Sequence, residues 1–226
     1  MASDQLGHTL MHEHIFVRNH EMEVNLPDAE WDPSSAVEDA VECLDGLYQS
    51  GVRTIVDLTV PGLGRDVALV AKVAERVPVN LVASTGWYTS NVLPIYFRFH
   101  GPDGTAGTDA LAELFVADIR EGIAGVGVRA GMLKVVTDRE GMTPDVERVM
   151  LAAALAHEET GVPITTHSHP ASRNGLEQQA FLEGRRVPGD RIIIGHSGDT
   201  DDIDYLRELM DRGSTIGMDR FGMEHV

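Results

Sequence analysis

The sequence has one cysteine, few aromatic residues and few basic residues, and each shortage narrows the class of protein. Cys43 has no cysteine partner in the chain, and the first residues lack the basic and apolar segments of a signal peptide, so we expect a cytoplasmic protein. Only 18 basic side chains accompany 36 acidic ones, which argues against nucleic acid and anionic membranes as partners, because their phosphates need Lys and Arg for neutralisation. No apolar run approaches the roughly 18 residues of a membrane span, so we expect no membrane association.

Nucleotide-binding signatures are also missing, since neither G-x-G-x-x-G nor G-x-x-x-x-G-K-[ST] occurs. Short β-branched segments instead alternate with segments of helical periodicity, which is typical of parallel strands joined by helices. Seven strands are predicted, at residues 9–17, 53–59, 79–86, 129–137, 162–167, 191–196 and 214–219. Helices are predicted at residues 33–49, 65–76, 109–124, 143–160, 173–184 and 201–212. The irregular segment 90–108 is long enough to be functional, and we expect it to overhang a site.

The pattern favours one α/β domain over residues 1–226, because a (β/α) barrel uses roughly 200–250 residues as one unit. Polar residues follow several predicted strands, and the C-terminal strand ends carry the chemistry of such barrels. We therefore predict a (β/α)8 barrel of the TIM type. Only seven strands are found, so the barrel is expected to be cut off after strand seven, without its eighth βα unit.

Two histidines stand at the end of the first predicted strand, in Met11-His12-Glu13-His14. Side chains alternate along a strand, so His12 and His14 point to one face and could converge on a metal ion. A pair of ordinary polar residues at a strand end explains the same pattern equally well.

Two more histidines end predicted strands, His167 after Pro163-Ile-Thr-Thr and His196 after Arg191-Ile-Ile-Ile-Gly. Each alone could be a hydrogen-bonded core histidine, but their recurrence at separate strand ends favours a metal site. His169 lies beyond its strand and is not expected to be a ligand. The remaining histidines are expected to face solvent: His8, His20, His100, His157 and His225.

Lys134 lies inside the apolar fourth strand, in Gly131-Met-Leu-Lys-Val-Val-Thr137. Lysine is rarely buried without a partner, and desolvation lowers its pKa. A neutral amine there could be a Schiff-base nucleophile, or could react with carbon dioxide to a carbamate whose two oxygens bridge two metals. A lysine whose charged end reaches solvent is the third alternative.

Seven motifs in order along the chain together resemble the phosphotriesterase-like family of the amidohydrolase superfamily. They are Gly7-His-Thr-Leu-Met-His-Glu-His14, Thr54-Ile-Val-Asp-Leu-Thr59 with Gly62-Leu-Gly-Arg-Asp66, Thr85-Gly-Trp-Tyr88, Gly131-Met-Leu-Lys134, Thr166-His167, Ile194-Gly-His196-Ser-Gly-Asp-Thr200 and Gly217-Met-Asp-Arg-Phe-Gly222.

The resemblance implies a distorted (β/α)8 barrel with two divalent metal ions, usually zinc, with iron, cobalt or manganese as alternatives. By position, His12 and His14 would bind the buried metal, and His167 and His196 the more exposed one. Lys134 would be carboxylated and bridge both metals, as would a hydroxide. Two such ions lower the pKa of water while one polarises the substrate. Family members are commonly homodimers, so a homodimer is a candidate assembly.

Family members that act mainly on lactones resemble this sequence at Tyr88 and Arg220. In them the tyrosine lies over the exposed metal, and the arginine follows the seventh strand at the mouth of the site. Organophosphate hydrolases typically carry tryptophan at the tyrosine position, so Tyr88 favours a lactonase. From the residues alone, Tyr88 could be a rim aromatic, and Arg220 could pair with a carboxylate such as Asp219. Asp199 could orient His196 or cap the next helix.

The family pattern continues beyond Arg220 into an eighth strand whose aspartate completes the buried metal's ligands. No residue here matches that aspartate, and Asp219 and Asp57, on other strands, are not expected to replace it. We expect a fragment of a longer protein, ahead of a barrel completed by a partner or a chain that has lost activity. A barrel left open would expose two strand edges.

The leading functional hypothesis is a metal-dependent hydrolase that opens lactones, acyl-homoserine lactones among them, by hydroxide attack, with phosphotriester hydrolysis as a promiscuous activity. An organophosphate hydrolase is the alternative within the family. A Schiff-base aldolase that uses Lys134 is the alternative from another mechanistic class, and the strand-end histidines count against it. An inactive metal-binding module is the non-enzymatic alternative, and the missing aspartate favours it.

Overall fold

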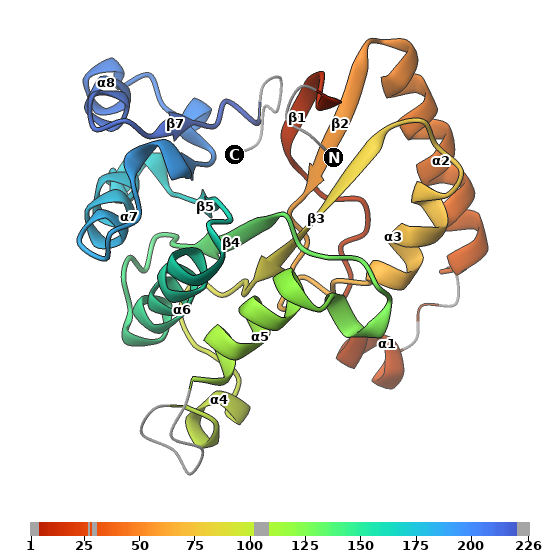
Figure 1. The fold of residues 1–226 in the computed structure, drawn as a ribbon, viewed down its shortest axis with the longest axis horizontal. Helices are drawn as coiled ribbons and strands as arrows, with labels where there is room; N and C mark the ends of the chain where they lie inside the picture. The colour runs from red at the N-terminus through yellow and green to blue at the C-terminus, as the bar shows by residue number, and fades with distance from the viewer. Residues whose placement is uncertain (1–4, 27, 29–30, 102–108, 221–226) are drawn as a thin grey trace.

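The fold is given by a computed structural model that describes residues 5–26, 28, 31–101 and 109–220. Seven parallel strands in those residues pair in chain order to form one curled sheet, which Figure 1 shows as a half-barrel with helices outside it. The strands are β1 (His8–Glu13), β2 (Val52–Asp57), β3 (Asn80–Gly86), β4 (Met132–Val136), β5 (Ile164–His167), β6 (Ile192–Ile194) and β7 (Thr215–Ile216). The predicted TIM-type (β/α) fold class, with seven parallel strands, is confirmed over the described residues.

The predicted helices are all present: α2 (Pro33–Gln49), α3 (Val67–Ala74), α5 (Ala110–Arg120), α6 (Pro144–Thr160), α7 (Asn174–Glu183) and α8 (Ile203–Asp211). Two short helices, α1 (His20–Asn25) and α4 (Tyr96–Phe99), follow β1 and β3. The sequence pattern misses both because one or two turns are too short to show helical periodicity. None of the helices formed by the described residues is both long and apolar enough to cross a membrane.

Local sequence explains where the long helices begin and end. The Asp32 carboxylate accepts the amide of Ser35 at the start of α2, and Pro33 occupies the first turn, where its missing N–H costs nothing. Thr143 caps α6 in the same way, and Gly161 ends that helix with a φ of 73°. These signals are local, so the sequence alone predicts both helices closely.

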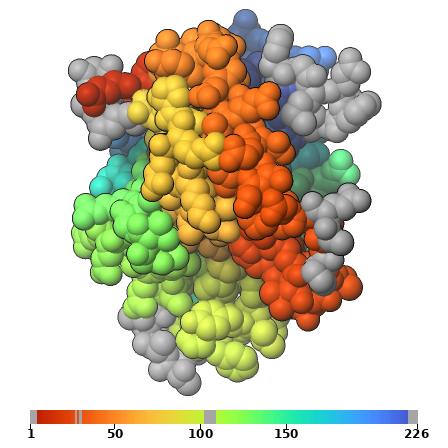
Figure 2. Space-filling model, turned by 90° about the vertical axis from the view of Figure 1, so that its right-hand side faces the viewer, coloured from red at the N-terminus to blue at the C-terminus, as the bar shows by residue number. Residues whose placement is uncertain are grey.

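Helices cover the outer face of the sheet and bury two main apolar clusters against it. α2 and α3 lie side by side over the first strands, as the orange and yellow surfaces of Figure 2 show. The larger cluster packs α5 to α8 against β4, β5 and β6, and includes Phe115, Leu133 and Ile164, all fully buried. Each such side chain stabilises the fold by about 1.5–3 kcal/mol. The packed outer layer holds the C-terminal strand ends in fixed positions.

Five strands end earlier than predicted, β2 and β4 by one or two residues and β1, β6 and β7 before the polar residues that follow them. β1 ends at Glu13, β6 at Ile194 and β7 at Ile216, so the polar residues that follow leave the hydrogen-bonded ladder. His196 is the clearest case, because its φ of 60° is left-handed and cannot continue a strand. Residues at these ends therefore face one another instead of continuing the sheet.

Candidate metal centre

Five polar side chains from separate strands meet where the strands end. His12 comes from β1, Lys134 from β4 and His167 from β5, while His196 and Asp219 follow β6 and β7. His12, Lys134 and His196 are buried. The predicted convergence of His12, His167 and His196 around Lys134 is therefore present in the geometry, and Asp219 is an addition.

His12 is held at both ring nitrogens. Its Nδ1 lies 2.5 Å from Oδ2 of Asp219, and its Nε2 lies 2.9 Å from Nζ of Lys134. Gly195 allows the ring to sit there, because a Cβ added at that glycine would lie 3.0 Å from Nδ1 of His12 and would collide with the carbonyl of Thr166. The carboxylate thus fixes the ring, and its Nε2 faces the interior of the cluster.

His196 is anchored through both its backbone and its ring by Asp219. Its amide donates to the two carboxylate oxygens at 2.9 and 3.1 Å, and its Nδ1 lies 3.0 Å from Oδ1. A left-handed backbone costs a non-glycine residue on the order of 1–2 kcal/mol, and these contacts offset that strain. The other nitrogen, Nε2, lies 3.0 Å from Nδ1 of His167, so two imidazoles face each other across the separation of a shared ion.

Lys134 is fully buried in a strand whose five residues are all buried. Burial lowers its pKa from 10.5 to about 7, with Asp219 opposing the shift and Arg220 adding to it. The amine is therefore substantially neutral near pH 7, which is the nucleophilic form.

Burial also keeps two imidazoles of the cluster neutral, those of His12 and His167. Burial lowers the pKa of His12 to about 4 and that of His167 to about 2. Burial alone would raise the pKa of Asp219, but hydrogen bonds from His12 and His196 outweigh it and hold that pKa below its usual range. Neutral imidazole and ionised carboxylate are the forms that bind metals.

His14 lies at the edge of this cluster and is exposed. Its ring stands edge-on to that of His12, with 5.6 Å between the centroids. Its Nδ1 lies 3.0 Å from Oγ1 of Thr59. The two histidines of the first motif are thus neighbours, but only His12 is buried.

The residues present fit divalent metal ions. His12, His196 and Asp219 each offer a ligand atom, and these atoms lie within 4.8 Å of one another. Around the same point stand the facing nitrogens of His167 and His196 and the amine of Lys134. Imidazole and carboxylate donors in this number are the set that zinc and related ions take.

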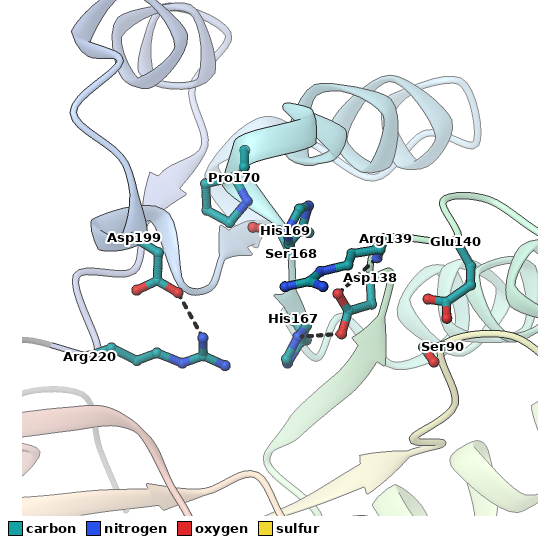
Figure 3. A pocket seen from close by; sticks show the side chains of 11 residues that line it. Ser90, Asp138, Arg139, Glu140, His167, Ser168, His169, Pro170, Asp199 and Arg220 are labelled. Atoms are coloured by element: carbon teal, nitrogen blue, oxygen red, sulfur yellow. Dashed lines mark hydrogen bonds and ion pairs between the residues drawn. The ribbon is translucent and has the colours of Figure 1, made fainter. Parts of the chain in front are cut away.

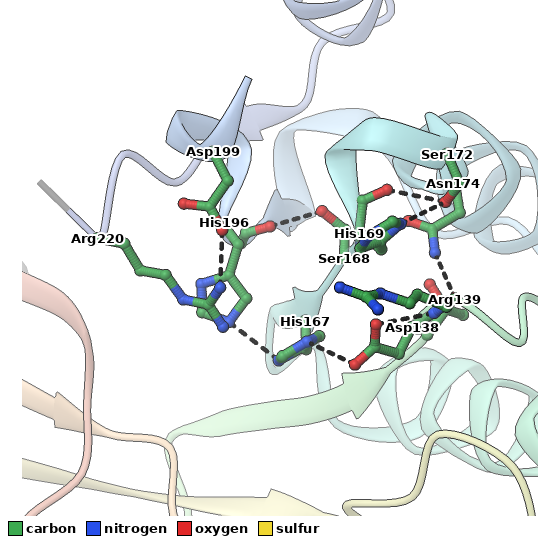
Figure 4. A network of polar contacts seen from close by, with 12 residues as sticks. Asp138, Arg139, His167, Ser168, His169, Ser172, Asn174, His196, Asp199 and Arg220 are labelled. Atoms are coloured by element: carbon green, nitrogen blue, oxygen red, sulfur yellow. Dashed lines mark hydrogen bonds and ion pairs between the residues drawn. The ribbon is translucent and has the colours of Figure 1, made fainter. Parts of the chain in front are cut away.

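A cavity of about 560 Å³ opens beside the cluster (Figure 3). Arg220 lines it and pairs with Asp199 at 2.7 Å, while Nε2 of His167 lies 3.5 Å from Oδ2 of Asp138. Figure 4 shows His167 between His196 and Asp138, so the cluster continues into the cavity wall. Tyr88 places its ring edge-on to His167 with 5.9 Å between centroids, and burial, then Asp138, raise the pKa of its hydroxyl.

Several expectations need correction. The carboxylate that pairs with Arg220 is Asp199, not Asp219. Asp199 does not cap the following helix, because Asp202 caps α8, and the carboxylate on the His196 ring is Asp219. His157 is buried in the last turn of α6, with Nδ1 lying 2.8 Å from the carbonyl of Val162.

Other expectations concern loop residues. His169 is a loop residue that lines the cavity, with Nδ1 lying 3.1 Å from the Ser172 hydroxyl. His8 and His20 are exposed, His100 is partly buried against Tyr96, and His225 lies outside the described residues. Of the segment expected to overhang a site, Ser90 lines the cavity and residues 102–108 lie outside the described residues.

Sequence reasoning missed Asp219 as a member of the cluster. It had set this residue aside because it belongs to strand seven rather than strand eight. The usable signal was the one that found the histidines, a polar residue directly after a predicted strand. Asp219 contacts two histidines, and one of them, His12, lies 207 residues away in the sequence, so no local pattern reveals the contact.

Comparisons with known proteins give a consistent result. The model of the phosphotriesterase family matches residues 1–226. The chain is 47% identical over 222 residues to a phosphotriesterase homology protein of Mycobacterium tuberculosis, covering 98% of this chain and 68% of that protein. It is 43% identical over 224 residues to an aryldialkylphosphatase of Saccharolobus solfataricus, covering 99% and 69%. The solved phosphotriesterase structure from Mycobacterium tuberculosis superposes with a TM-score of 0.95 at 46% identity, covering 99% and 69%.

Proposed function

This chain belongs to the phosphotriesterase family, and on that premise we propose that it is a binuclear metal-dependent hydrolase that opens lactones. The observation that carries the proposal is Lys134, a buried amine with a pKa of about 7 that lies 2.9 Å from Nε2 of His12. Burying an amine costs free energy, and a lysine with a strongly shifted pKa beside several imidazoles is typical of a functional site.

In this proposal His12 and His14 hold one metal ion, and His167 and His196 hold the other. Zinc is the proposed ion, with iron, cobalt or manganese as alternatives. The ions would supply a low-pKa water as nucleophile and would polarise the substrate carbonyl. Asp219 holds His12 and His196 through their Nδ1 atoms, which leaves both Nε2 atoms for binding.

Lys134 is proposed to carry a carbamate. Its neutral nitrogen attacks the carbon of carbon dioxide, so that a C–N bond forms while one C=O π bond opens and leaves its electron pair on oxygen. The amine proton passes to solvent. The product bears one negative charge on two oxygens, enough to bridge two cations and to remove the penalty of an uncompensated buried amine.

Two residues at the cavity are proposed to handle the substrate. The Tyr88 hydroxyl stays protonated because burial raises its pKa, so it can donate to the carbonyl oxygen of a lactone. Arg220, held by Asp199, can attract the carboxylate that ring opening produces. Acyl-homoserine lactones are one candidate class.

Phosphotriester hydrolysis is the second candidate, because the chain is 43% identical to a protein named aryldialkylphosphatase. The test is metal analysis together with kcat/KM on a lactone and on an aryl dialkyl phosphate. We expect two metal ions per chain and a preference for the lactone. Absence of any transition metal would contradict the proposal, while a phosphate preference would select the alternative.

Two alternatives from other classes are tested alongside. A Schiff-base aldolase would form an adduct on Lys134 that borohydride traps, and we expect no such adduct. A metal-binding module without activity would load metal but hydrolyse neither ester. The homodimer, the small-molecule ester substrate and the cytoplasmic location stay predictions, and light scattering tests the first.

A further inference from the structure

Asp57 is a buried carboxylate for which the proposed reaction has no use. It ends β2, is 5% exposed, and forms no ion pair in the described part of the chain. Arg65 lines the same small cavity but pairs with Asp118 at 2.7 Å. Burial raises the pKa of Asp57, so an ionised side chain here must be compensated by hydrogen bonds.

The hydrogen bonds of Asp57 surround His14. The amide of Thr59 donates to Oδ1 at 3.0 Å. Interactions with the Thr59 hydroxyl and the Ile15 amide lower the pKa of the same carboxylate and so oppose the effect of burial. Ile15 directly follows His14, and Thr59 contacts the His14 ring. One carboxylate therefore holds the backbone on one side of this histidine and the hydroxyl that its ring touches.

The Thr59 hydroxyl is the hydrogen-bond neighbour of Nδ1 of His14. Its Oγ1 lies 3.0 Å from Nδ1 of His14, and Thr59 is itself buried. A hydroxyl has one proton to donate, and an ionised carboxylate can only accept. With Asp57 ionised, the proton of Thr59 is donated to that carboxylate, and Oγ1 accepts from an N–H at Nδ1 of His14. Nε2 of His14 is then left with a free lone pair.

We propose that Asp57 and Thr59 are positioning residues that fix the tautomer and orientation of His14 so that its Nε2 binds metal. This rests on the proposed function, in which His14 is a ligand. We call this chain of contacts from Asp57 through Thr59 to His14 the relay. His14 needs it because Asp219 contacts His12 and His196 directly, whereas His14 lies at the exposed edge of the cluster. Thr59 provides an oxygen acceptor at Nδ1 of His14, as Asp219 does at Nδ1 of His12 and of His196.

Thr59→Val tests the relay, because valine keeps the shape of threonine and lacks the hydroxyl. Thr59→Ser should restore the function, and Asp57→Asn is a second variant at the other end of the relay. The matched control is Thr85→Val, since Thr85 is also buried and its hydroxyl donates to a carboxylate, that of Asp118, at 2.7 Å. Thr85→Val loses a comparable hydrogen bond away from His14.

The readouts are zinc affinity by chelator competition and the 15N signal of the His14 imidazole. We expect Thr59→Val to lower the binding affinity for one of the two zinc ions by about 10-fold or more, as is usual when the hydrogen-bond partner of a metal-bound imidazole is removed. The Nδ1–H signal of His14 should disappear or shift. Asp57→Asn should act in the same direction, Thr59→Ser should resemble the wild type, and Thr85→Val should bind zinc normally.

Two results would overturn the relay: unchanged zinc affinity and tautomer in Thr59→Val, or an equal loss in Thr59→Val and Thr85→Val. If the wild type binds two zinc ions and opens a lactone in either case, only the relay fails. A wild type that binds no zinc removes the proposed function and the relay with it.

Discussion

The buried side of the metal centre and its open mouth are built differently. On the buried side, Lys134 contacts His12, and Asp219 holds both His12 and His196 at distances of 2.5 to 3.0 Å. At the mouth, the Arg220–Asp199 pair is partly exposed, and His167 lies 3.5 Å from Asp138. Short contacts away from water are strong, whereas contacts in water are screened and weaker. The buried side should therefore decide whether metal binds, and the mouth should decide which substrate is used.

The largest expected effect is that of Lys134→Met, which replaces the buried amine with an apolar side chain of similar length. Removing a partner of a ligand typically costs 10–100-fold, so losing the bridging group should lower activity by more than about 100-fold and reduce metal content. Metal analysis and kcat/KM measure this. Lys72, the other lysine of the chain, is exposed, so Lys72→Met is the control and should be inert. Wild-type activity in Lys134→Met would contradict the role of the amine.

The second-largest effect is expected for Asp219→Asn, because this change weakens the hydrogen bonds that hold His12 and His196. An amide keeps one acceptor oxygen where the carboxylate offers two, and His196 makes three of the contacts with Asp219. Metal affinity should fall by roughly 10- to 100-fold. Chelator competition measures it. A variant that is folded by circular dichroism and keeps its metal affinity would show that the buried side does not depend on this carboxylate.

Asp199→Asn is the matched change at the mouth, and it should have a smaller effect of another kind. The pair with Arg220 is lost, and a net hydrogen bond is worth about 0.5–1.5 kcal/mol, or roughly 2- to 10-fold. The increase is expected in KM for the lactone, with metal affinity unchanged. Steady-state kinetics and chelator competition on the two Asp→Asn variants separate the two sides of the site. A loss of metal in Asp199→Asn equal to that in Asp219→Asn would remove the distinction.

The elements of the fold were predictable where their signals are local. α2 has the predicted bounds because Asp32 and Pro33 mark its start within a few residues. β7 was predicted at 214–219 and is Thr215–Ile216, because its ladder pairing is limited to the short strand β6, where the amide of Gly217 donates to the Ile194 carbonyl at 2.7 Å. That bond depends on a strand distant in sequence, and local propensity does not contain it.

The site divides in the same way. His12, His167, His196 and Lys134 could be named from residue type and strand position, because parallel strands bring their ends to one edge. The partners of these residues could not be named. Asp219 reaches back to the first strand and Thr59 reaches across to it, and both contacts exist only after the sheet has curled.

His169→Ala should have the smallest effect and tests how far the buried side extends. His169 lines the cavity two residues beyond His167, and its Nδ1 lies 3.1 Å from the hydroxyl of Ser172. It sits on a loop that a 3-10 turn at Pro170–Ser172 continues, so its ring is held by a neighbour and not by the cluster. Metal content and kcat/KM should stay within about twofold of wild type, the usual range for a substitution outside the core. His167→Ala is the paired variant, and we expect it to lose metal. If His169→Ala lost metal as well, the boundary between ligand residues and cavity wall would lie farther out than the contacts of His167 place it.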